Sequence, residues 1–224
     1  MYRARPLTVV LESNIAGGKS TCIDILQQEP SLFCQSEPVA LWESLATAEG
    51  DTVNLVLAFY KNPRRFCFEL QEIVRLTFLE QLETEPPAGR AVEARVLERC
   101  IFSSEVFTRA GGHLTPAQEA IFMHWQEFLW RQESLRPDLL IYLEVSPRVC
   151  MERVRGRARP GEEKVTWKYL CQLNQQYRRW LRNMSGQGVQ IAKVDGDQSK
   201  ENVAREVQEI IRAVTEAVSS CVGK

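Results

Sequence analysis

The sequence has few of the features that mark membrane, secreted or metal-dependent proteins. No apolar run approaches the length of a bilayer span. The seven cysteines make no C-x-x-C pair and form an odd set, which favours reduced thiols over a disulfide framework. The two histidines, His113 and His124, are far from zinc-ligand spacing. The formal net charge of -1 gives no reason to expect a nucleic-acid or membrane surface.

The N-terminal stretch also lacks room for a targeting signal. The residues MYRARPLTVV enter an apolar segment within about six positions, too soon for a signal or transit segment to precede it. We therefore predict a cytoplasmic location, with the nucleus left open. The chain of 224 residues, with 44% hydrophobic and 25% charged residues, predicts one globular domain over 1–224 with its own core.

Short β-rich segments alternate with helix-length segments along the chain. Strands are predicted at 7–11, 31–35, 90–97, 138–145 and 189–194, and apolar spacing predicts helices over 63–82 and 203–218. Loops are expected at 84–90 and 184–188. This alternation predicts an α/β fold with a mostly parallel sheet flanked by helices.

Residues 12–21, ESNIAGGKST, match a phosphate-binding loop except at the first glycine. Gly18, Lys19 and Ser20 are in place, but Ser13 stands where that glycine belongs. The stretch follows a predicted strand and precedes a helical pattern, so a phosphate would lie at a helix N-terminus. The GTPase signatures D-x-x-G and N-K-x-D are absent, which disfavours a GTP-driven switch and favours a phosphoryl transferase.

Further charged residues fall where strands are predicted to end. Glu37 follows the second strand, at the edge where open α/β sheets bind ligands, and is a candidate general base unless it simply ends the strand at the surface. Glu98 and Arg99 close the third strand. The segment MERVRGRARPGEE carries four arginines and ends in a Pro-Gly hinge, which favours a mobile lid over about 153–163 rather than an ordinary solvated helix face.

Taken in order, these motifs resemble the cellular-type deoxyribonucleoside kinases. The resemblance runs from residue 7 to about 182 through ESNIAGGKST, SEPVALW, YKNPRRFCFELQ, LERCIFS, PDLLIYLEVSP and the arginine-rich lid. It implies a P-loop NTPase-type sheet of five parallel strands, a homodimer, and ATP-dependent phosphorylation of a deoxyribonucleoside at its 5′-hydroxyl in nucleotide salvage, with Mg²⁺.

The resemblance also implies a role for individual residues. Glu37 would accept the 5′-hydroxyl proton with Arg99 beside it, Ser20 and Glu98 would hold Mg²⁺, and Tyr60 and Glu162 would bind the 3′-hydroxyl. The residues expected to bind ATP are Asn14, Ala16, Gly17, Gly18, Lys19, Ser20, Thr21, Arg153, Arg157, Arg159 and Asp195.

The nucleobase is expected to meet the helix over 63–82. Gln71, Val74 and Phe78 share one face of this helix, while Phe66, Leu70 and Ile73 occupy another that can face the core. By resemblance Gln71 would bind the base edge, Trp42 would wall the pocket, and Phe78 with Ser104 would replace the charged pair of members that prefer deoxycytidine and purines. Thymidine is therefore the favoured substrate and deoxycytidine the second.

Two departures from the family pattern keep alternatives open. The family form is near E-G-N-I-G-S-G-K-S-T, so we predict an ordinary, negative φ at Ser13. Thr108 stands where the family has an aromatic residue that stacks on the base, and the adjacent Phe107 is a candidate replacement. The alternatives are a nucleoside monophosphate kinase, disfavoured because residues 36–60 contain no arginine or lysine, and a nucleotide-binding protein without catalysis.

Overall fold

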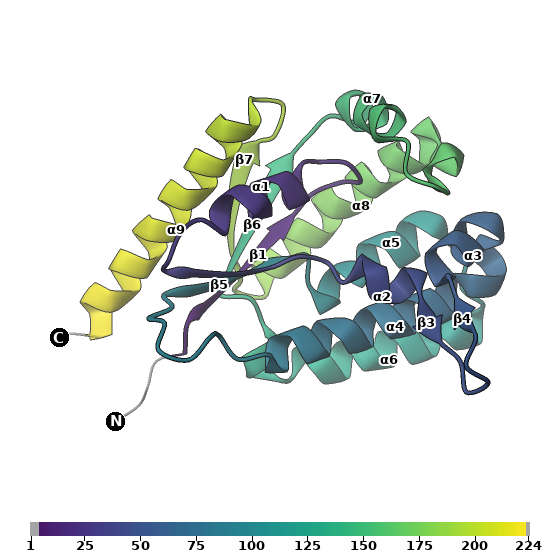
Figure 1. The fold of residues 1–224 in the computed structure, drawn as a ribbon, viewed down its shortest axis with the longest axis horizontal. Coiled ribbons are helices and arrows are strands. Elements are labelled where there is room, and N and C mark those ends of the chain that lie inside the picture. The colour runs from purple at the N-terminus through teal and green to yellow at the C-terminus, as the bar shows by residue number, and fades with distance from the viewer. Residues whose placement is uncertain (1–4, 223–224) are drawn as a thin grey trace.

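The computed structural model describes residues 5–222, so the ends of the domain predicted for 1–224 lie outside the described residues. Its centre is a five-stranded, all-parallel sheet in the order β2-β5-β1-β6-β7, which confirms the predicted fold class (Figure 1). The strands are β1 (Leu7–Glu12), β2 (Leu32–Gln35), β5 (Ala94–Glu98), β6 (Leu139–Glu144) and β7 (Gln190–Asp195). Parallel order requires crossover helices, which explains the alternation of the sequence pattern.

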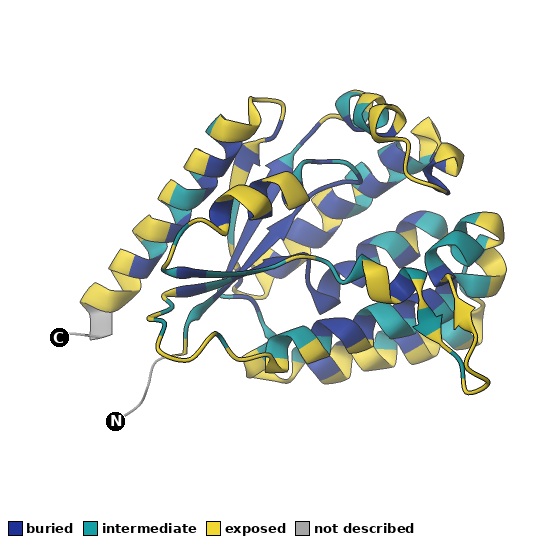
Figure 2. Ribbon diagram, in the orientation of Figure 1, coloured by how far each residue is buried: buried dark blue, intermediate teal, exposed yellow. Residues whose placement is uncertain are grey.

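Two layers of helices enclose this sheet. The helices α1 (Lys19–Leu26) and α9 (Lys200–Val222) cover one face (Figure 1). The other face carries α4 (Pro63–Glu83), α5 (Ser104–Gly111), α6 (Pro116–Trp130), α7 (Pro147–Arg157) and α8 (Trp167–Gly186). Figure 2 shows the three inner strands, β1, β5 and β6, largely buried between the layers, whereas the edge strands β2 and β7 are more exposed. The mainly apolar sequence of the inner strands follows from this double burial.

Smaller elements complete the chain between β2 and α4 and near the lid. They are α2 (Val39–Glu43), β3 (Leu45–Ala46), β4 (Thr52–Val53), α3 (Leu55–Lys61) and three single 3₁₀ turns, η1 (Ile101–Ser103), η2 (Glu133–Leu135) and η3 (Glu162–Lys164). The antiparallel β3–β4 hairpin was not predicted. Among residues 5–222, none of the helices has the length and apolarity needed to cross a bilayer.

Strand alternation decides which residues of β1 face which layer. Val9 and Leu11 belong to the core beneath α1 and α9, whereas Val10 belongs to the core beneath α8. Glu12, two positions after Val10, therefore points to the α8 side, where its register partner on β6 is Tyr142. The phosphate loop then leaves the sheet from its central strand, at its carboxyl edge.

The prediction was wrong at two element boundaries. The third strand begins at Ala94 rather than at residue 90, because the Arg90 guanidinium is engaged with the carbonyls of Glu29 and Leu32, at 2.8 and 2.7 Å, below the ladder. The expected loop 184–188 is mostly helix, since α8 continues to Gly186 and the chain turns only at Gly188, where φ is 90°. A short glycine-containing stretch did not end this amphipathic helix.

Candidate active site

A cavity of about 700 Å³ opens at the carboxyl edge of the sheet, between the phosphate loop, α4, α5 and the lid. It contains nearly every residue predicted for the site. Those that line it are Ala16, Gly17, Gly18, Lys19, Ser20, Thr21, Glu37, Trp42, Tyr60, Gln71, Val74, Phe78, Glu98, Arg99, Ser104, Arg153, Arg157, Arg159 and Glu162. Residues from six separate stretches of the sequence thus meet in one space.

Asn14 and Asp195 are the predicted residues that do not line this cavity. The fully buried Asn14 side chain donates to the Leu170 carbonyl at 3.0 Å and accepts the Ile15 N–H at 2.8 Å, so it ties the loop to α8. Asp195 is the last residue of β7, and its carboxylate accepts the Asp197 N–H at 3.0 Å. The cavity is lined instead by the residues that follow, Gly196, Gln198 and Lys200.

The phosphate loop is intact although its first glycine is missing. Ser13 is absent from the residues with positive φ, which confirms the predicted ordinary backbone, and its hydroxyl donates to the Leu143 carbonyl at 2.8 Å. Gly18 caps α1 with φ 92°, a left-handed conformation that favours glycine. Ala16 also has a positive φ, 55°, which costs about 1–2 kcal/mol in a non-glycine residue.

Ser13 and Gly17 fill the same space. A Cβ atom built on Gly17 would lie 1.8 Å from the Ser13 hydroxyl oxygen and 2.6 Å from the Ser13 Cβ. No side chain fits at residue 17 while Ser13 keeps its position. The resembled family form has the two residues exchanged, with glycine at position 13 and serine at position 17. The departures at positions 13 and 17 are therefore one compensated exchange, and Ala16, where the family form has glycine, is a separate departure.

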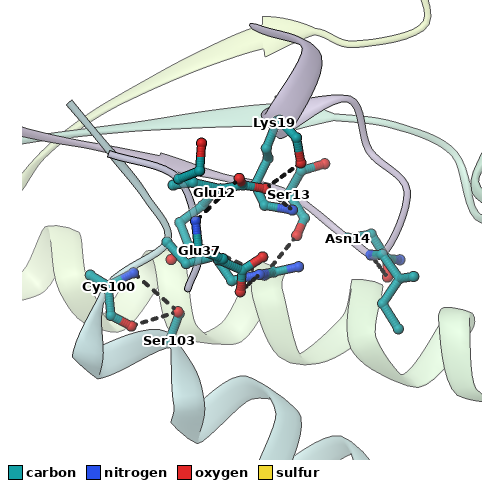
Figure 3. A network of polar contacts seen from close by, with 12 residues as sticks. Glu12, Ser13, Asn14, Lys19, Glu37, Cys100 and Ser103 are labelled. Atoms are coloured by element: carbon teal, nitrogen blue, oxygen red, sulfur yellow. Dashed lines mark hydrogen bonds and ion pairs between the residues drawn. The ribbon is translucent and has the colours of Figure 1, made fainter. Parts of the chain in front are cut away.

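Two carboxylates, Glu37 and Glu98, and two cations, Arg99 and Lys19, meet in the cavity. Arg99 Nε lies 3.0 Å from Oε1 of Glu37, which is labelled in Figure 3. Glu98 accepts the Ser20 hydroxyl at 2.8 Å. Lys19 Nζ lies 3.8 Å from Glu98, whose second oxygen is 3.4 Å from the Glu37 backbone N–H. Glu37 is 17% exposed and so remains reachable from the cavity, whereas the other three side chains of these ion pairs, Arg99, Lys19 and Glu98, are buried.

Burial lowers the pKa values of the two cations, whereas the neighbouring carboxylates raise them. Burial works to lower the pKa of Arg99, but Tyr177 and the carboxylates of Glu37 and Glu12 together raise it. Burial, and then the charge of Arg99, lower the pKa of Lys19, partly offset by the neighbouring carboxylates. Arg99 thus keeps its proton throughout the accessible pH range.

Ser20 and Glu98 fit Mg²⁺, a hard cation that prefers oxygen ligands. The described residues contain no group of three His, Cys, Asp or Glu side chains placed to hold a metal. Mg²⁺ is usually bound by only one or two protein oxygens together with substrate phosphates and water. The hydroxyl and carboxylate, already 2.8 Å apart beside the loop, match that ligand set.

The lid arginines converge on the phosphate end of the cavity. Arg153 donates to the Gly196 carbonyl at 3.1 Å, and Arg157 forms a two-pronged pair with Glu162, with Nε to Oε2 at 2.7 Å. Tyr60 packs closely on Gly161, where an added Cβ would be 2.7 Å from the tyrosine ring. Burial, then the charge of Glu162, raises the pKa of Tyr60 to about 12, so its hydroxyl keeps its proton.

The opposite end of the cavity is apolar, with one amide. Gln71 is buried on the cavity face of α4, and Trp42 meets Phe78 edge to face at 6.2 Å while donating to Thr77 at 2.9 Å. Leu70 also lines the cavity, so the predicted division of α4 into a pocket face and a core face was too strict. Leu70 nevertheless belongs to the core as predicted, and Phe66 and Ile73 pack against it.

The rotation of α5 decides which of two adjacent residues, Phe107 or Thr108, faces the cavity. Phe107 lines the cavity, and the Arg99 guanidinium lies 4.5 Å from the centre of its ring. Thr108 is buried and does not line the cavity. The adjacent aromatic proposed as a replacement is therefore the one available to stack.

Two residues of this network escaped sequence reasoning. Glu12 and Tyr177 lie outside the cavity lining but both contact Arg99. A carboxylate at the end of an apolar strand was the only signal for Glu12. Tyr177 lies mid-way along α8, 78 positions from Arg99, where local pattern carries no information on that contact.

Comparison with known proteins agrees with this geometry. Residues 9–219 match the family model described as deoxynucleoside kinase. The chain is similar to deoxycytidine kinase 2 of Gallus gallus, with 28% identity over 80% of this chain and 76% of that protein. It is also similar to mitochondrial thymidine kinase 2 of Homo sapiens, with 27% identity. That match covers 77% of this chain and 63% of the relative, just under two thirds of its length. Mitochondrial deoxyguanosine kinase of Xenopus laevis is 29% identical over 76% of this chain and 71% of that protein.

Proposed function

Because the chain belongs to the deoxynucleoside kinase family, whose members phosphorylate nucleosides, we propose that it transfers the γ-phosphoryl group of ATP to the 5′-hydroxyl of a deoxyribonucleoside. The observation that carries this proposal is the Glu37–Arg99 pair, 3.0 Å apart, in one cavity with a phosphate loop at one end and Gln71 at the other. In this proposal the chain folds as one domain over 1–224. It works in the cytoplasm, where it takes part in nucleotide salvage.

Glu37 serves as the general base. Its partly exposed carboxylate accepts the 5′-hydroxyl proton while the 5′-oxygen bonds to the γ-phosphorus and the bond to ADP breaks. Arg99 holds the same hydroxyl and offsets the negative charge that develops there. Lys19 and the free N–H groups at the start of α1 grip the phosphates, and Arg153, Arg157 and Arg159 close over the transferred group.

Ser20 and Glu98 hold Mg²⁺ in this proposal. When bound, the ion neutralises phosphate charge and orients the γ-phosphate. The sugar is selected at the lid, where Tyr60 donates and Glu162 accepts hydrogen bonds with the 3′-hydroxyl. The Glu162 carboxylate then accepts hydrogen bonds from both the 3′-hydroxyl and Arg157. Nucleoside binding and the position of the lid are therefore linked through this one side chain.

Thymidine is the favoured substrate and deoxycytidine the second. The Gln71 amide has both a donor and an acceptor and can pair with either pyrimidine. The apolar Phe78 and the small Ser104 supply no charge for a purine or a cytosine amino group. Phe107 stacks on the base in place of the family aromatic. The relatives named above include thymidine, deoxycytidine and deoxyguanosine kinases, so the preference belongs to this proposal alone.

A homodimer is part of the same proposal. Large apolar side chains are exposed on α4 and α6, namely Leu76, Ile121, Trp125 and Phe128. Trp125 and Phe128 pack edge to face at 5.9 Å, and Figure 2 shows exposed residues along the outward side of α6. Exposed apolar side chains of this kind support burial against a second copy. Sedimentation of a Trp125→Glu variant should give a monomer where the unchanged chain gives a dimer.

A Glu37→Gln variant tests the chemistry. The amide keeps the shape of the side chain but cannot accept the hydroxyl proton, so thymidine binding measured by calorimetry should persist while turnover falls by about 10²-fold or more. Arg64→Gln is a matched control, because this charge on α4 lies outside the cavity lining. Turnover of Glu37→Gln at the unchanged rate would remove Glu37 from this role.

Two alternatives give different results in the same assays. A nucleoside monophosphate kinase would turn over dTMP faster than thymidine, although residues 36–60 contain no cation for the acceptor phosphate. A nucleotide-binding protein without catalysis would give calorimetric binding of thymidine and ATP with no product.

A further inference from the structure

Glu12 ends β1 directly before the phosphate loop, and no step above uses it. Its side chain is 0% exposed and faces the α8 layer. Glu12 Oε2 accepts the Tyr177 hydroxyl at 3.0 Å and lies 3.3 Å from Arg99 Nη1. Because Glu12 does not line the cavity, any effect it has on the reaction must pass through another residue.

Arg99 is held from two sides. On the buried side its Nη1 donates to Glu12, to the Ser13 carbonyl at 3.1 Å and to the Tyr177 hydroxyl. On the cavity side its Nε donates to Glu37 at 3.0 Å. Figure 3 shows Glu12, Ser13 and Glu37 gathered around this guanidinium. One cation is therefore shared between a buried carboxylate and the carboxylate proposed as the base.

Stability does not account for this arrangement. Glu12 Oε1 is buried and has no partner in hydrogen-bonding geometry among the described residues, although the nearby Ser103 hydroxyl lowers the pKa of Glu12, and a buried carboxylate with an incompletely paired oxygen is costly. The backbone of Arg99 has φ 64°, which is strained for a residue with a side chain. Burial also raises the pKa of Glu12 against the opposing charge of Arg99. Such costs persist where the surroundings fix a functional group.

We propose that Glu12 is a positioning residue that, with Tyr177, anchors Arg99 so that Glu37 is free to turn to the substrate hydroxyl. This inference rests on the proposed function. Without the negative charge of Glu12, Arg99 has Glu37 as its nearest anion and holds it in the pair. With Glu12 in place, the Arg99 guanidinium keeps its contact with Glu12 on the buried side when Glu37 takes up a proton.

Glu12→Gln keeps the side-chain shape and removes the charge. Its kcat for thymidine should fall roughly 10- to 100-fold, the loss expected for one hydrogen bond to a charged group. The KM values for thymidine and ATP should stay within about twofold, because Glu12 touches neither site. Tyr177→Phe should lower kcat by a smaller factor, and the double variant should be no slower than Glu12→Gln, because both act through Arg99.

Tyr142→Phe is the matched control. Tyr142 is an equally buried tyrosine packed against Tyr177 at 5.3 Å between ring centres, and its hydroxyl has no partner among the described residues. Its kcat should equal that of the unchanged chain. Unchanged kcat in Glu12→Gln, or equal losses in Tyr142→Phe and Tyr177→Phe, would overturn the proposal. If Glu12→Gln does not fold, the comparison of the two tyrosine variants decides.

A second readout does not depend on turnover. Proton exchange at the Arg99 Nη1–H groups, assigned in ¹⁵N NMR spectra by their loss in Arg99→Lys, should be at least about tenfold faster in Glu12→Gln, because these hydrogens lose the carboxylate that accepts them. Equal exchange rates would overturn the proposal. If the unchanged chain phosphorylates no nucleoside, the proposed function fails, while this exchange measurement still decides whether Glu12 positions Arg99.

Discussion

Exchanging Ser13 and Gly17 should restore what either change alone removes. A side chain at residue 17 meets the Ser13 hydroxyl at 1.8 Å, so Gly17→Ser must displace Ser13 and break its 2.8 Å hydrogen bond to Leu143. Overpacking of this kind costs about 1–3 kcal/mol. Ser13→Gly alone loses the hydrogen bond and adds backbone freedom, together about 1–2 kcal/mol.

The double variant Ser13→Gly/Gly17→Ser has one side chain in the shared space, as the unchanged chain has. Its free energy of unfolding should lie within about 1 kcal/mol of the unchanged value, which corresponds to a favourable coupling of about 1–5 kcal/mol between the two substitutions. Since about 1.4 kcal/mol is tenfold in affinity, Gly17→Ser should raise the KM for ATP about tenfold and the exchange should reverse this.

Urea unfolding and steady-state kinetics with varied ATP measure both effects. Gly186→Ala is the control, because an added Cβ there meets nothing within 4 Å and the residue lies in α8. It should leave the KM for ATP unchanged and stability equal or slightly higher. If the double variant loses the sum of the two single losses, the two residues are independent and the steric reasoning is wrong.

Three further predictions concern strain, sugar recognition and thiol reactivity. Ala16→Gly relieves the positive φ of 55° at some cost in chain entropy, so Tm should rise by about 1–2 °C in calorimetry. Glu162→Gln should raise the KM for thymidine roughly tenfold, with little change for 3′-deoxythymidine, because only the former offers a 3′-hydroxyl. Burial raises the pKa of Cys22 to about 12 and of Cys34 to about 11, so mass spectrometry at pH 8 should show iodoacetamide alkylating Cys34 about two, and Cys22 about three, orders of magnitude more slowly than a free thiol.

Each of these has a clear contrary result. A lower Tm in Ala16→Gly would mean that the methyl group contributes more by packing than the backbone loses by strain. Equal KM changes for thymidine and 3′-deoxythymidine would remove Glu162 from the 3′-hydroxyl site. Alkylation of Cys22 and Cys34 at the rate of glutathione would show that these thiols are less buried than in the structure.

The sequence predicted what depends on short-range pattern. Apolar runs placed the five parallel strands within a few residues, apart from the late start of β5, and the charged residues that follow them share one edge because parallel strands end together. Glu37, Glu98 and Arg99 meet for that reason. The compensation between Ser13 and Gly17 was out of reach, because it depends on distances within the loop.

Contacts between remote elements were equally beyond the pattern. The anchoring of Arg99 by Tyr177 joins residues 78 positions apart, through the packing of α8 on the sheet. The choice of Phe107 over Thr108 depended on the rotation of α5, which adjacent residues in a helix cannot reveal. The last strand was predicted to end at residue 194 but ends at Asp195, so the cavity lining there begins at Gly196.

The central claim, phosphorylation of a deoxyribonucleoside with thymidine favoured, is tested most directly by incubating the chain with Mg-ATP and a panel of nucleosides and nucleoside monophosphates. Chromatography of the products should show 5′-monophosphates, with kcat/KM highest for thymidine, deoxycytidine second, and purine deoxynucleosides and dTMP well below. Formation of no monophosphate from any nucleoside would contradict the assigned activity, and a purine ranked first would contradict the assigned pocket.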